Sequence, residues 1–403
     1  MQRRAHRTAV IRRLCARPGR SAPELAIALG LPMSIVAPSL RQLVLEGLIL
    51  ERRERGTASG RVLPRYRLDP ARLALLGADV GIDRLRVVAT SLSGQVLASA
   101  TQPYGKARSA MSCIDSLATT ALRVCGKLGK VAPHVVGLGV GLPGHQEEPA
   151  GEPPHGSFLR TRDVPFGPLL ARELEGSPLE GTPLLVSPAA DVAALGELEF
   201  GPAIDGPASL LYLSLEEDLH AGIVVDGQLL TPRRPSVGGV GHTILQVDGP
   251  RCACGRSGCA RAMIGSDSLL AGTEPDSVEA LRRRLDAGAP EALAAVARAG
   301  ACLGTLLHNL ALLYRPSRIV VGGPMTGLGD ALLRPARSVL GGSDFTLRTP
   351  HVELSLSHFG DDAVAMGAAA LVRHRLCADP GGTMARATRR SDATCTPRLF
   401  LTG

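Results

Sequence analysis

Three cysteines fall within eight residues of this 403-residue chain, and their spacing restricts the local fold more than any other feature. Cys252 and Cys254 are followed by Cys259 across a glycine-containing turn, which lets the three sulfurs converge. His242 lies upstream and can supply a fourth ligand. A closed shell of three thiolates and one imidazole is typical of structural zinc, because no coordination position remains for a substrate. We therefore predict a structural zinc site; the alternative is a cluster of inert buried thiols.

The remaining cysteines indicate the compartment. The chain contains nine cysteines, an odd number, and those outside the cluster are scattered. This pattern favours a reducing compartment over a disulfide framework. No apolar run approaches the ~18 residues that a membrane span needs, and Arg3-Arg4 is not followed by an apolar signal core. The sequence predicts a cytoplasmic protein without membrane association.

Positive charge is concentrated at the start of the chain. Residues 1–69 contain fourteen Arg and five acidic residues, which give a formal charge of +9. Because the whole chain carries +8, the remainder carries −1. A basic head on a near-neutral body is expected of a module that binds a polyanion such as double-stranded DNA. The alternative is a solubilising Arg-rich segment.

The first two helices of the head have clear boundaries. Residues 8–14 place Val10, Ile11 and Leu14 on one face of a helix. Ser21, with Glu24 three residues later, forms a capping box that begins a second helix. Gly30 is expected to end it, and a short turn then leads to a third helix.

The third helix and the hairpin after it complete the pattern of a winged helix-turn-helix. Val36, Leu40 and Leu43 point one apolar stripe inward. A strand at 48–50, an Arg-rich turn at 52–60 and a return strand at 61–68 then form the wing. In such a module the third helix enters the major groove and the wing reaches the backbone or the minor groove.

Outward-facing polar residues are the candidates for DNA contact. Arg and Gln side chains can read guanine and adenine edges respectively. The candidates lie on the third helix and on the wing: Ser34, Arg41, Gln42, Arg53, Arg55 and Arg61. The alternative for the wing is a solvated basic hairpin. Pro38 predicts that the third helix is either kinked or short, since proline within a helix removes a hydrogen bond.

Residues 70–378 alternate between strand-like and helical segments, which predicts an α/β body. Strands are expected at 73–80, 85–90, 95–100, 135–140, 184–186, 209–215, 222–225 and 318–321, with helices at 109–128, 190–200 and 291–313. We therefore expect three parts: a winged helix-turn-helix at 1–69, the body at 70–378, and a flexible polar tail at 379–403.

The segment Gly241-His242 followed by the cysteine cluster resembles the signature of the ROK family of repressors, open reading frames and sugar kinases. The glycine run 137–144 and the segment 315–323 resemble two further family motifs, so the resemblance covers residues 8–375. It implies an actin-like, ribonuclease-H-like body of two lobes, a homodimer or homotetramer, and a sugar pocket. In family kinases an Asp acts as general base towards the sugar hydroxyl, and ATP binds opposite the sugar.

The phosphate loops of such kinases are altered in this chain. The first, similar to D-x-G-G-T-K, reads Asp79-Val80-Gly81-Ile82-Asp83-Arg84. The second, glycine-rich in kinases, aligns with Glu216-Glu217-Asp218, whose carboxylates replace backbone N–H groups. Like charges ~4 Å apart cost about 4 kcal/mol near a protein surface, so we expect ATP to be repelled.

The catalytic segment of the kinases is altered as well. Their N-D-A-N motif aligns with residues 188–191, which puts Ala189 at the position of the base. Alanine cannot accept a proton, so we expect no catalytic residue and no enzyme activity. Asp191, two residues later, is interpreted as a cap for the following helix, with a substitute base as the alternative.

Sugar contacts are also reduced. Gly239 and Arg261 stand where the family's sugar-binding Glu residues stand, and only His242 is retained. Arg261 with His242 is a candidate site for a sugar phosphate or sugar acid, whereas the alternative is a solvated or salt-bridged Arg261. Three functions are therefore weighed: a transcription regulator that binds an operator, a repressor first of all; a residual carbohydrate kinase; and a ligand-free protein-interaction module.

Overall fold

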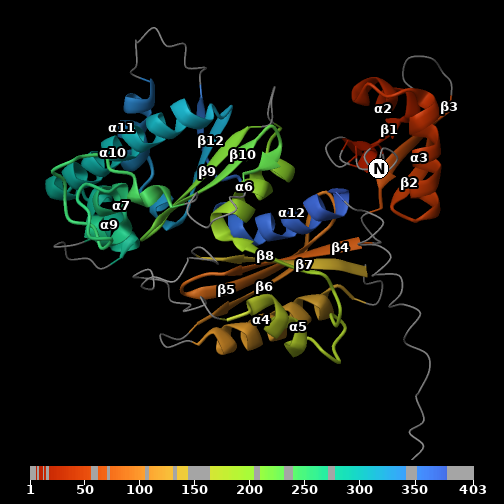
Figure 1. Cartoon of the computed structure of the whole chain (residues 1–403), viewed down its shortest axis with the longest axis horizontal. Coiled ribbons are helices and arrows are strands. Elements are labelled where there is room, and N and C mark those ends of the chain that lie inside the picture. The colour runs from red at the N-terminus through yellow and green to blue at the C-terminus, as the bar shows by residue number, and fades with distance from the viewer. Residues whose placement is uncertain are drawn as a thin grey trace, which may run out of the picture. The chain divides into compact units, whose positions relative to one another are not determined.

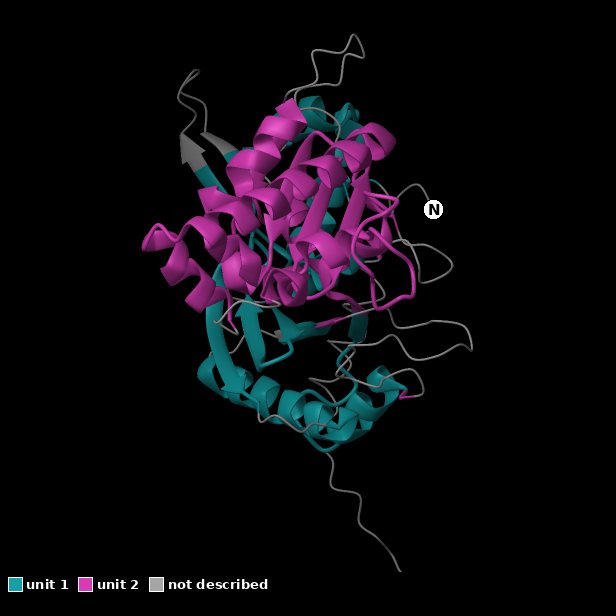
Figure 2. Cartoon of the chain, turned by 90° about the vertical axis from the view of Figure 1, so that its left-hand side faces the viewer, with its two compact units in different colours: residues 1–140, 165–186, 368–403 teal, residues 141–164, 187–367 magenta. Residues whose placement is uncertain are grey.

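The computed structural model describes residue 6, residues 9–11, 13–14, 18–55, 62–69, 73–104, 109–129, 134–143, 164–203, 209–230, 239–270, 277–341 and 352–378. These residues belong to two compact units (Figure 2). The first unit comprises residues 1–140, 165–186 and 368–403, and the second comprises residues 141–164 and 187–367. The predicted tail at 379–403 lies outside the described residues.

The first unit begins with a small sheet beside helices (Figure 1). Residues 9–11 and 13–14 are helical. They are followed by β1 (Arg20–Ser21), α2 (Ala22–Leu29), α3 (Met33–Leu45), β2 (Ile49–Arg55) and β3 (Val62–Leu68). The strands pair in the order β1-β3-β2, and both pairings are antiparallel. The three predicted helices and the hairpin are thus present in the expected order.

The predicted apolar face of each helix is buried. Val10, Ile11 and Leu14 are buried, as are Leu25 of α2 and the stripe Val36, Leu40 and Leu43 of α3. The start of α2 has the predicted capping box, because the Ser21 N–H donates to Oε2 of Glu24 at 2.9 Å. Gly30 ends α2 in the left-handed conformation, with φ at 61°.

Two boundaries in the head differ from the prediction. The third helix is not short: α3 begins at Met33 and continues through Pro38. Proline has no N–H, so the Ser34 carbonyl lacks its usual helical partner there. The wing strand β2 extends to Arg55, so Arg52, Arg53 and Arg55 lie on a strand rather than in the turn. Pairing with β3 satisfies the backbone of this polar segment, in the register Arg53↔Pro64.

The larger sheet of the first unit has the strand order β6-β5-β4-β7-β8. Its strands are β4 (Leu73–Val80), β5 (Arg84–Thr90), β6 (Val96–Pro103), β7 (His134–Leu142) and β8 (Leu184–Pro188). Helices α4 (Ala110–Lys127) and α5 (Phe166–Glu173) pack together, and α4 contacts β4, β5 and β6. The predicted strands 73–80, 85–90, 95–100, 135–140 and 184–186 and the helix 109–128 are confirmed.

The glycine run of β7 serves helix packing. A Cβ on Gly139 would collide with the backbone carbonyl of Ala368, in helix α12 (Ala363–Ala378). On Gly137 it would collide with the side chain of Val372 in the same helix. The helix therefore lies directly on the strand, and these positions need glycine because of space.

The second unit contains a sheet of order β11-β10-β9-β12-β13. Its strands are β9 (Leu210–Leu215), β10 (Leu219–Val225), β11 (Gln228–Leu229), β12 (Arg318–Gly322) and β13 (Glu353–Leu356). β9 pairs antiparallel with β10 and parallel with β12, and β12 pairs parallel with β13. Strands at 209–215, 222–225 and 318–321 were predicted and are confirmed; β11 and β13 were not predicted.

Helices cover this second sheet through two apolar clusters. One cluster joins the sheet to α7 (Ala260–Ile264), α8 (Ser266–Leu270), α9 (Val278–Asp286), α10 (Pro290–Tyr314) and α11 (Asp330–Gly341). The other joins it to α6 (Ala189–Glu199). Short 3-10 turns lie at η1 (Val240–His242), η2 (Pro324–Leu328) and η3 (Gly360–Asp362).

The sequence was expected to contain no apolar run as long as a membrane span, but among the described residues one helix, α10, is long and apolar enough to cross a membrane by length and composition. Half of its most apolar window is buried inside the protein, and the helix packs against α11 and α7. The buried apolar residues of this helix belong to the core of the second unit, whereas Leu293, Leu312 and Leu313 are exposed.

Candidate metal centre and the loops around it

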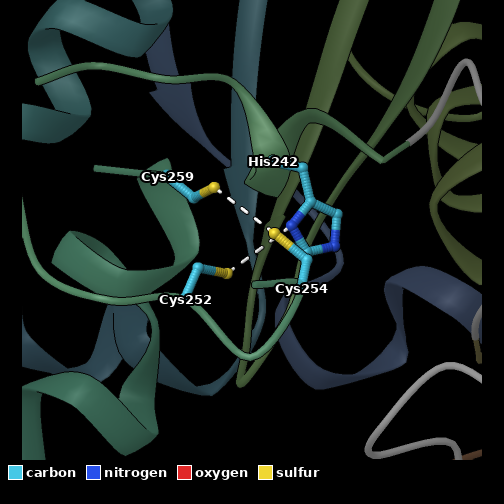
Figure 3. Close-up of side chains that lie close together, drawn as sticks. All are labelled: His242, Cys252, Cys254 and Cys259. Atoms are coloured by element: carbon cyan, nitrogen blue, oxygen red, sulfur yellow. Dashed lines mark hydrogen bonds between the residues drawn. The ribbon is translucent and has the colours of Figure 1, made fainter. Parts of the chain in front are cut away.

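The predicted ligands meet at one point of the second unit. His242, Cys252, Cys254 and Cys259 each offer one ligand atom, and these atoms lie within 4.8 Å of one another (Figure 3). The Cys252 Sγ is 3.7 Å from Nδ1 of His242, and the Cys254 Sγ is 3.7 Å from the Cys259 Sγ. Cys252 and Cys259 are buried, whereas Cys254 and His242 are exposed.

A tight loop brings the three cysteines together. The Cys252 N–H donates to the Arg256 carbonyl at 2.8 Å, and the Gly258 N–H donates to the Pro250 carbonyl at 2.8 Å. Gly258 has φ at 70°, and a Cβ there would collide with the backbone of Gln246. Only glycine fits such a position. The glycine spacing is therefore part of what makes the cysteines converge.

The donor set fits a metal that prefers sulfur and nitrogen. Thiolates and imidazole suit zinc, and four such ligands form a closed tetrahedral shell. Burial and the neighbouring sulfurs raise the pKa of Cys259 to about 12, so without a metal this thiol keeps its proton. A metal ion must displace that proton on binding. A bound metal supplies cross-linking of the loop and no vacant coordination position.

The acidic loop between β9 and β10 is partly neutralised by Arg261. The guanidinium Nη2 lies 2.6 Å from Oε1 of Glu217, and Nε lies 2.9 Å from Oδ1 of Asp218. Glu216 accepts a hydrogen bond from the Ser214 hydroxyl at 2.8 Å. From the sequence, Arg261 was a candidate for binding an anionic ligand, with a solvated or salt-bridged Arg261 as the alternative. The observed geometry is that alternative, and it leaves less of Arg261 available to an anionic ligand.

The segment aligned with the catalytic motif begins helix α6. Ala189 is the first residue of the helix, and Pro188 is its N-cap. The expectation that Asp191 caps the helix is therefore wrong: Asp191 lies in the first turn. Burial raises the pKa of Asp191 to about 7. Sequence reasoning missed this environment because burial depends on the packing of distant segments.

The loop aligned with the first phosphate loop is a tight turn between β4 and β5. The Gly81 N–H donates to the Arg84 carbonyl at 3.0 Å, which closes the turn on itself. Ile82, at the tip of this turn, is 46% exposed. A backbone amide that already bonds within the turn is not available to a phosphate.

The candidate DNA contacts divide into described and undescribed residues. Ser34, Arg41 and Gln42 are exposed on α3, and Arg53 is exposed on β2. The side chain of Arg55 and all of Arg61 lie outside the described residues.

Two further residues of the head, Arg65 and Tyr66, have environments that the sequence did not indicate. Arg65 donates to the Gly19 carbonyl at 2.6 Å and lies 3.4 Å from Oε2 of Glu24, so it braces β3 against the start of α2. Burial raises the pKa of Tyr66, and the neighbouring carboxylate of Glu51 raises it further.

Comparisons with known proteins identify the family. The model of the ROK family matches residues 75–375, and the chain therefore belongs to the ROK family. The xylose repressor of Caldicellulosiruptor bescii is 24% identical over 358 residues, which cover 82% of this chain and 86% of the repressor. The glucokinase of Halalkalibacterium halodurans is 25% identical over 320 residues, which cover 74% of this chain and 95% of that enzyme.

A solved structure supports the fold over nearly the whole chain. The crystal structure of a ROK family transcriptional regulator, a homologue of the E. coli Mlc protein, superimposes with a TM-score of 0.76 at 21% identity. The match covers 96% of this chain and 99% of the regulator. The α/β, two-lobed sugar-kinase-like body predicted from the sequence is thus confirmed, and the family contains both regulators and sugar kinases.

Proposed function

We propose that this protein is a DNA-binding transcription regulator, a repressor, whose ROK body does not phosphorylate sugars. The observation that carries the proposal is the head: α3 presents Ser34, Arg41 and Gln42 to solvent while its apolar stripe is buried. An exposed polar helix face followed by a basic β-hairpin is the arrangement of a winged helix-turn-helix that reads the major groove. A regulator of this kind acts in the cytoplasm, where the genome lies.

The likeness to regulators extends into the head. The regulator crystal structure covers 96% of this chain, whereas that of the ROK glucokinase from Streptomyces griseus covers 75%. The additional coverage favours a protein built like a regulator. The domain boundaries at residues 69 and 378 stay predictions; β3 and β4, on either side of residue 69, belong to different sheets.

A carbohydrate kinase is the second candidate, because relatives include enzymes named glucokinase. Against it stands Ala189, which has no group to accept the proton of a sugar hydroxyl. The loop at 216–218 adds three carboxylates where phosphate would approach. An assay that couples ADP release to absorbance separates the candidates. Sugar-dependent ADP release by the purified protein contradicts the proposal that its ROK body does not phosphorylate sugars.

The remaining parts of the proposal concern the body. His242, Cys252, Cys254 and Cys259 hold a structural zinc ion, since their donor atoms already converge. The protein acts as a homodimer or homotetramer, because two heads fit the two half-sites of a palindromic operator. Its effector is a sugar, a sugar phosphate or a sugar acid, in keeping with the sugar repressor among its relatives.

The experiment that tests the proposal selects fragments of the host genome with the purified full chain at near-physiological salt. The test variant carries Arg53→Ala with Arg55→Ala, and the matched control carries Arg298→Ala with Arg334→Ala, two exposed arginines of the body. We expect enrichment of a few palindrome-bearing fragments with wild type and control, and loss of enrichment with the wing variant. Retention that is equal for all sequences, or absent, contradicts the proposal and favours a protein-interaction module.

A further inference from the structure

Arg261 connects the cysteine loop to the hairpin between β9 and β10. Its guanidinium bonds two successive carboxylates of the hairpin, with Nη2 2.6 Å from Glu217 and Nε 2.9 Å from Asp218. The Arg261 side chain is only 13% exposed, so these ion pairs are largely shielded from water. Charge-assisted hydrogen bonds from one planar guanidinium to two carboxylates restrict both partners geometrically.

The backbones of the two segments also approach closely at this place. The Ser266 N–H, just after α7, donates to the Glu216 carbonyl at 3.1 Å. A Cβ on Gly265 would lie 2.5 Å from the Glu217 carbonyl oxygen, which leaves no room for a side chain. The end of α7 and the tip of the hairpin are therefore in direct contact through main-chain atoms as well as through Arg261.

Two of the four candidate metal ligands position this contact. Cys259 is the N-cap of α7, and Arg261 follows it by two residues. Ala260, the residue after Cys259, is held by a backbone hydrogen bond: its N–H donates to the carbonyl of Thr243, the neighbour of His242, at 2.8 Å. Gly241, on the other side of His242, packs on Leu219, where its Cβ would lie 3.2 Å from the Leu219 amide nitrogen. The ligand cluster thus holds both segments that touch the hairpin.

Without Arg261 the hairpin would contain excess negative charge. Burial raises the pKa of Glu217, and the carboxylate of Asp267 in α8 raises it further, whereas Arg261 lowers it. The carboxylates of Asp267 and Asp218 therefore repel that of Glu217, and the guanidinium of Arg261 offsets this repulsion. Displacement of Arg261 favours separation of these carboxylates and opening of the hairpin.

We propose that Arg261 transmits the metal occupancy of the cysteine cluster to this acidic hairpin. With metal bound, α7 is fixed at Cys259 and Arg261 holds Glu217 and Asp218 in place. When the metal leaves, the start of α7 loses its anchor, and the hairpin opens with its carboxylates exposed to water. The inference rests on the metal site of the proposed function, and it makes the hairpin a metal-dependent element of the regulator.

Hydrogen–deuterium exchange of the full chain tests the proposal, with peptides that cover residues 210–225 and 290–314. Metal content is measured in parallel by inductively coupled plasma mass spectrometry. The variants are Arg261→Gln, which removes the charge and shortens the side chain but keeps it polar, Arg261→Lys, which keeps the charge, and the control Arg282→Gln, which removes an exposed ion pair to Asp286. We expect chelation of wild type to accelerate exchange around residues 215–219 about tenfold or more, since the protection depends on local opening.

The metal-loaded Arg261→Gln variant is the decisive sample. We expect it to retain one metal ion per chain and to show the same fast hairpin exchange, with Arg261→Lys intermediate and Arg282→Gln unchanged. If chelation also accelerates exchange in α10, the second unit has opened as a whole, and only the metal-loaded Arg261→Gln variant then tests the role of Arg261. If the chain binds metal but neither chelation nor Arg261→Gln changes the exchange of the hairpin, the inference is overturned and the metal site of the proposed function is not. A chain that retains no metal overturns the metal site of the proposed function and the inference together.

Discussion

Asp191 combines an acidic side chain with a largely buried position in the first turn of α6. Burial penalises the charged carboxylate, which is why its pKa is raised to about 7. An acid whose pKa is higher in the folded than in the unfolded chain binds more protons when folded. Stability contributed by protonated Asp191 is therefore present at low pH and is lost as the pH rises through about 7.

Replacement of Asp191 by Asn should remove this pH dependence. We expect Asp191→Asn to match wild type near pH 4 and to be more stable at pH 8, by a magnitude on the order of 2–4 kcal/mol. Urea unfolding followed by circular dichroism at both pH values measures the difference. Asp115→Asn, on the exposed face of α4, is the control and should shift neither curve. A wild-type advantage at pH 8 would show that Asp191 is ionised and bound to a partner.

Gly139 allows a second test at the scale of one residue. An alanine Cβ there collides with the backbone of Ala368, and backbone atoms cannot move aside as side chains do. We expect Gly139→Ala to destabilise the first unit by ~2 kcal/mol or more, as overpacking does. Gly126→Ala in α4 is the control: nothing lies within 4 Å of its Cβ position, and helix propensity predicts a gain of about 0.5–1 kcal/mol. Thermal unfolding of both variants should give shifts of opposite sign.

At the scale of elements, helix α3 shows where sequence reasoning succeeded and where it failed. The stripe of Val36, Leu40 and Leu43 was predicted from periodicity, and all three side chains are fully buried. The position of Pro38 was ambiguous, because a proline predicts either a helix start or a helix interior with a lost hydrogen bond. Packing of the stripe across the whole helix outweighs the local cost at Pro38, and the helix begins five residues earlier, at Met33.

Replacement of Pro38 should therefore stabilise the head. Pro38 is exposed, so Pro38→Ala removes no buried contact and restores an N–H for the Ser34 carbonyl. We expect a gain of ~1–3 kcal/mol, since an interior proline costs about 3 kcal/mol relative to alanine. Pro32→Ala, at the exposed N-cap of the same helix, is the control and should give little change. Calorimetry of the full chain measures both; an unaltered or lower melting temperature for Pro38→Ala argues that the proline sets a required bend.

At the scale of the whole molecule, the proposed function joins a basic head that binds DNA to a ROK body with a metal site. If the head binds DNA through phosphates, the affinity must fall steeply with salt, because cation release drives such binding. We expect the logarithm of the association constant to fall linearly with the logarithm of salt concentration, and Arg53→Ala to reduce the slope by about 1. Fluorescence anisotropy with a selected fragment measures the slope, and an unchanged slope places Arg53 away from the phosphates.

Metal removal tests the body of the protein. We expect one zinc ion per chain, lost in Cys259→Ser and retained in Cys302→Ser, a cysteine of α10 outside the cluster. Chelation should lower the melting temperature by about 4–8 °C, since a loss of ~2 kcal/mol shifts the melting temperature by about 2–4 °C per kcal/mol in a unit of this size. Differential scanning calorimetry with and without chelator measures the shift. Equal melting temperatures for chelated and loaded protein would exclude a structural metal.

The sequence alone determined the features that depend on neighbours along the chain. The convergence of Cys252, Cys254 and Cys259 follows from their spacing and from a turn between them that only glycine can form. The strands and helices of the body follow from hydrophobic periodicity, which reports locally which face is buried. The wing strand was cut short in the prediction because its residues are polar and its pairing partner lies further along the chain.

Only the tertiary structure decided which charged groups meet. Arg261 and Glu217 are 44 residues apart, and no local pattern indicates that the arginine after the last cysteine neutralises a hairpin in another part of the unit. Asp191 was interpreted as a cap, whereas long-range packing buries its carboxylate. Electrostatic energies depend on distance and solvent exposure, and both quantities are set when segments remote in sequence pack together.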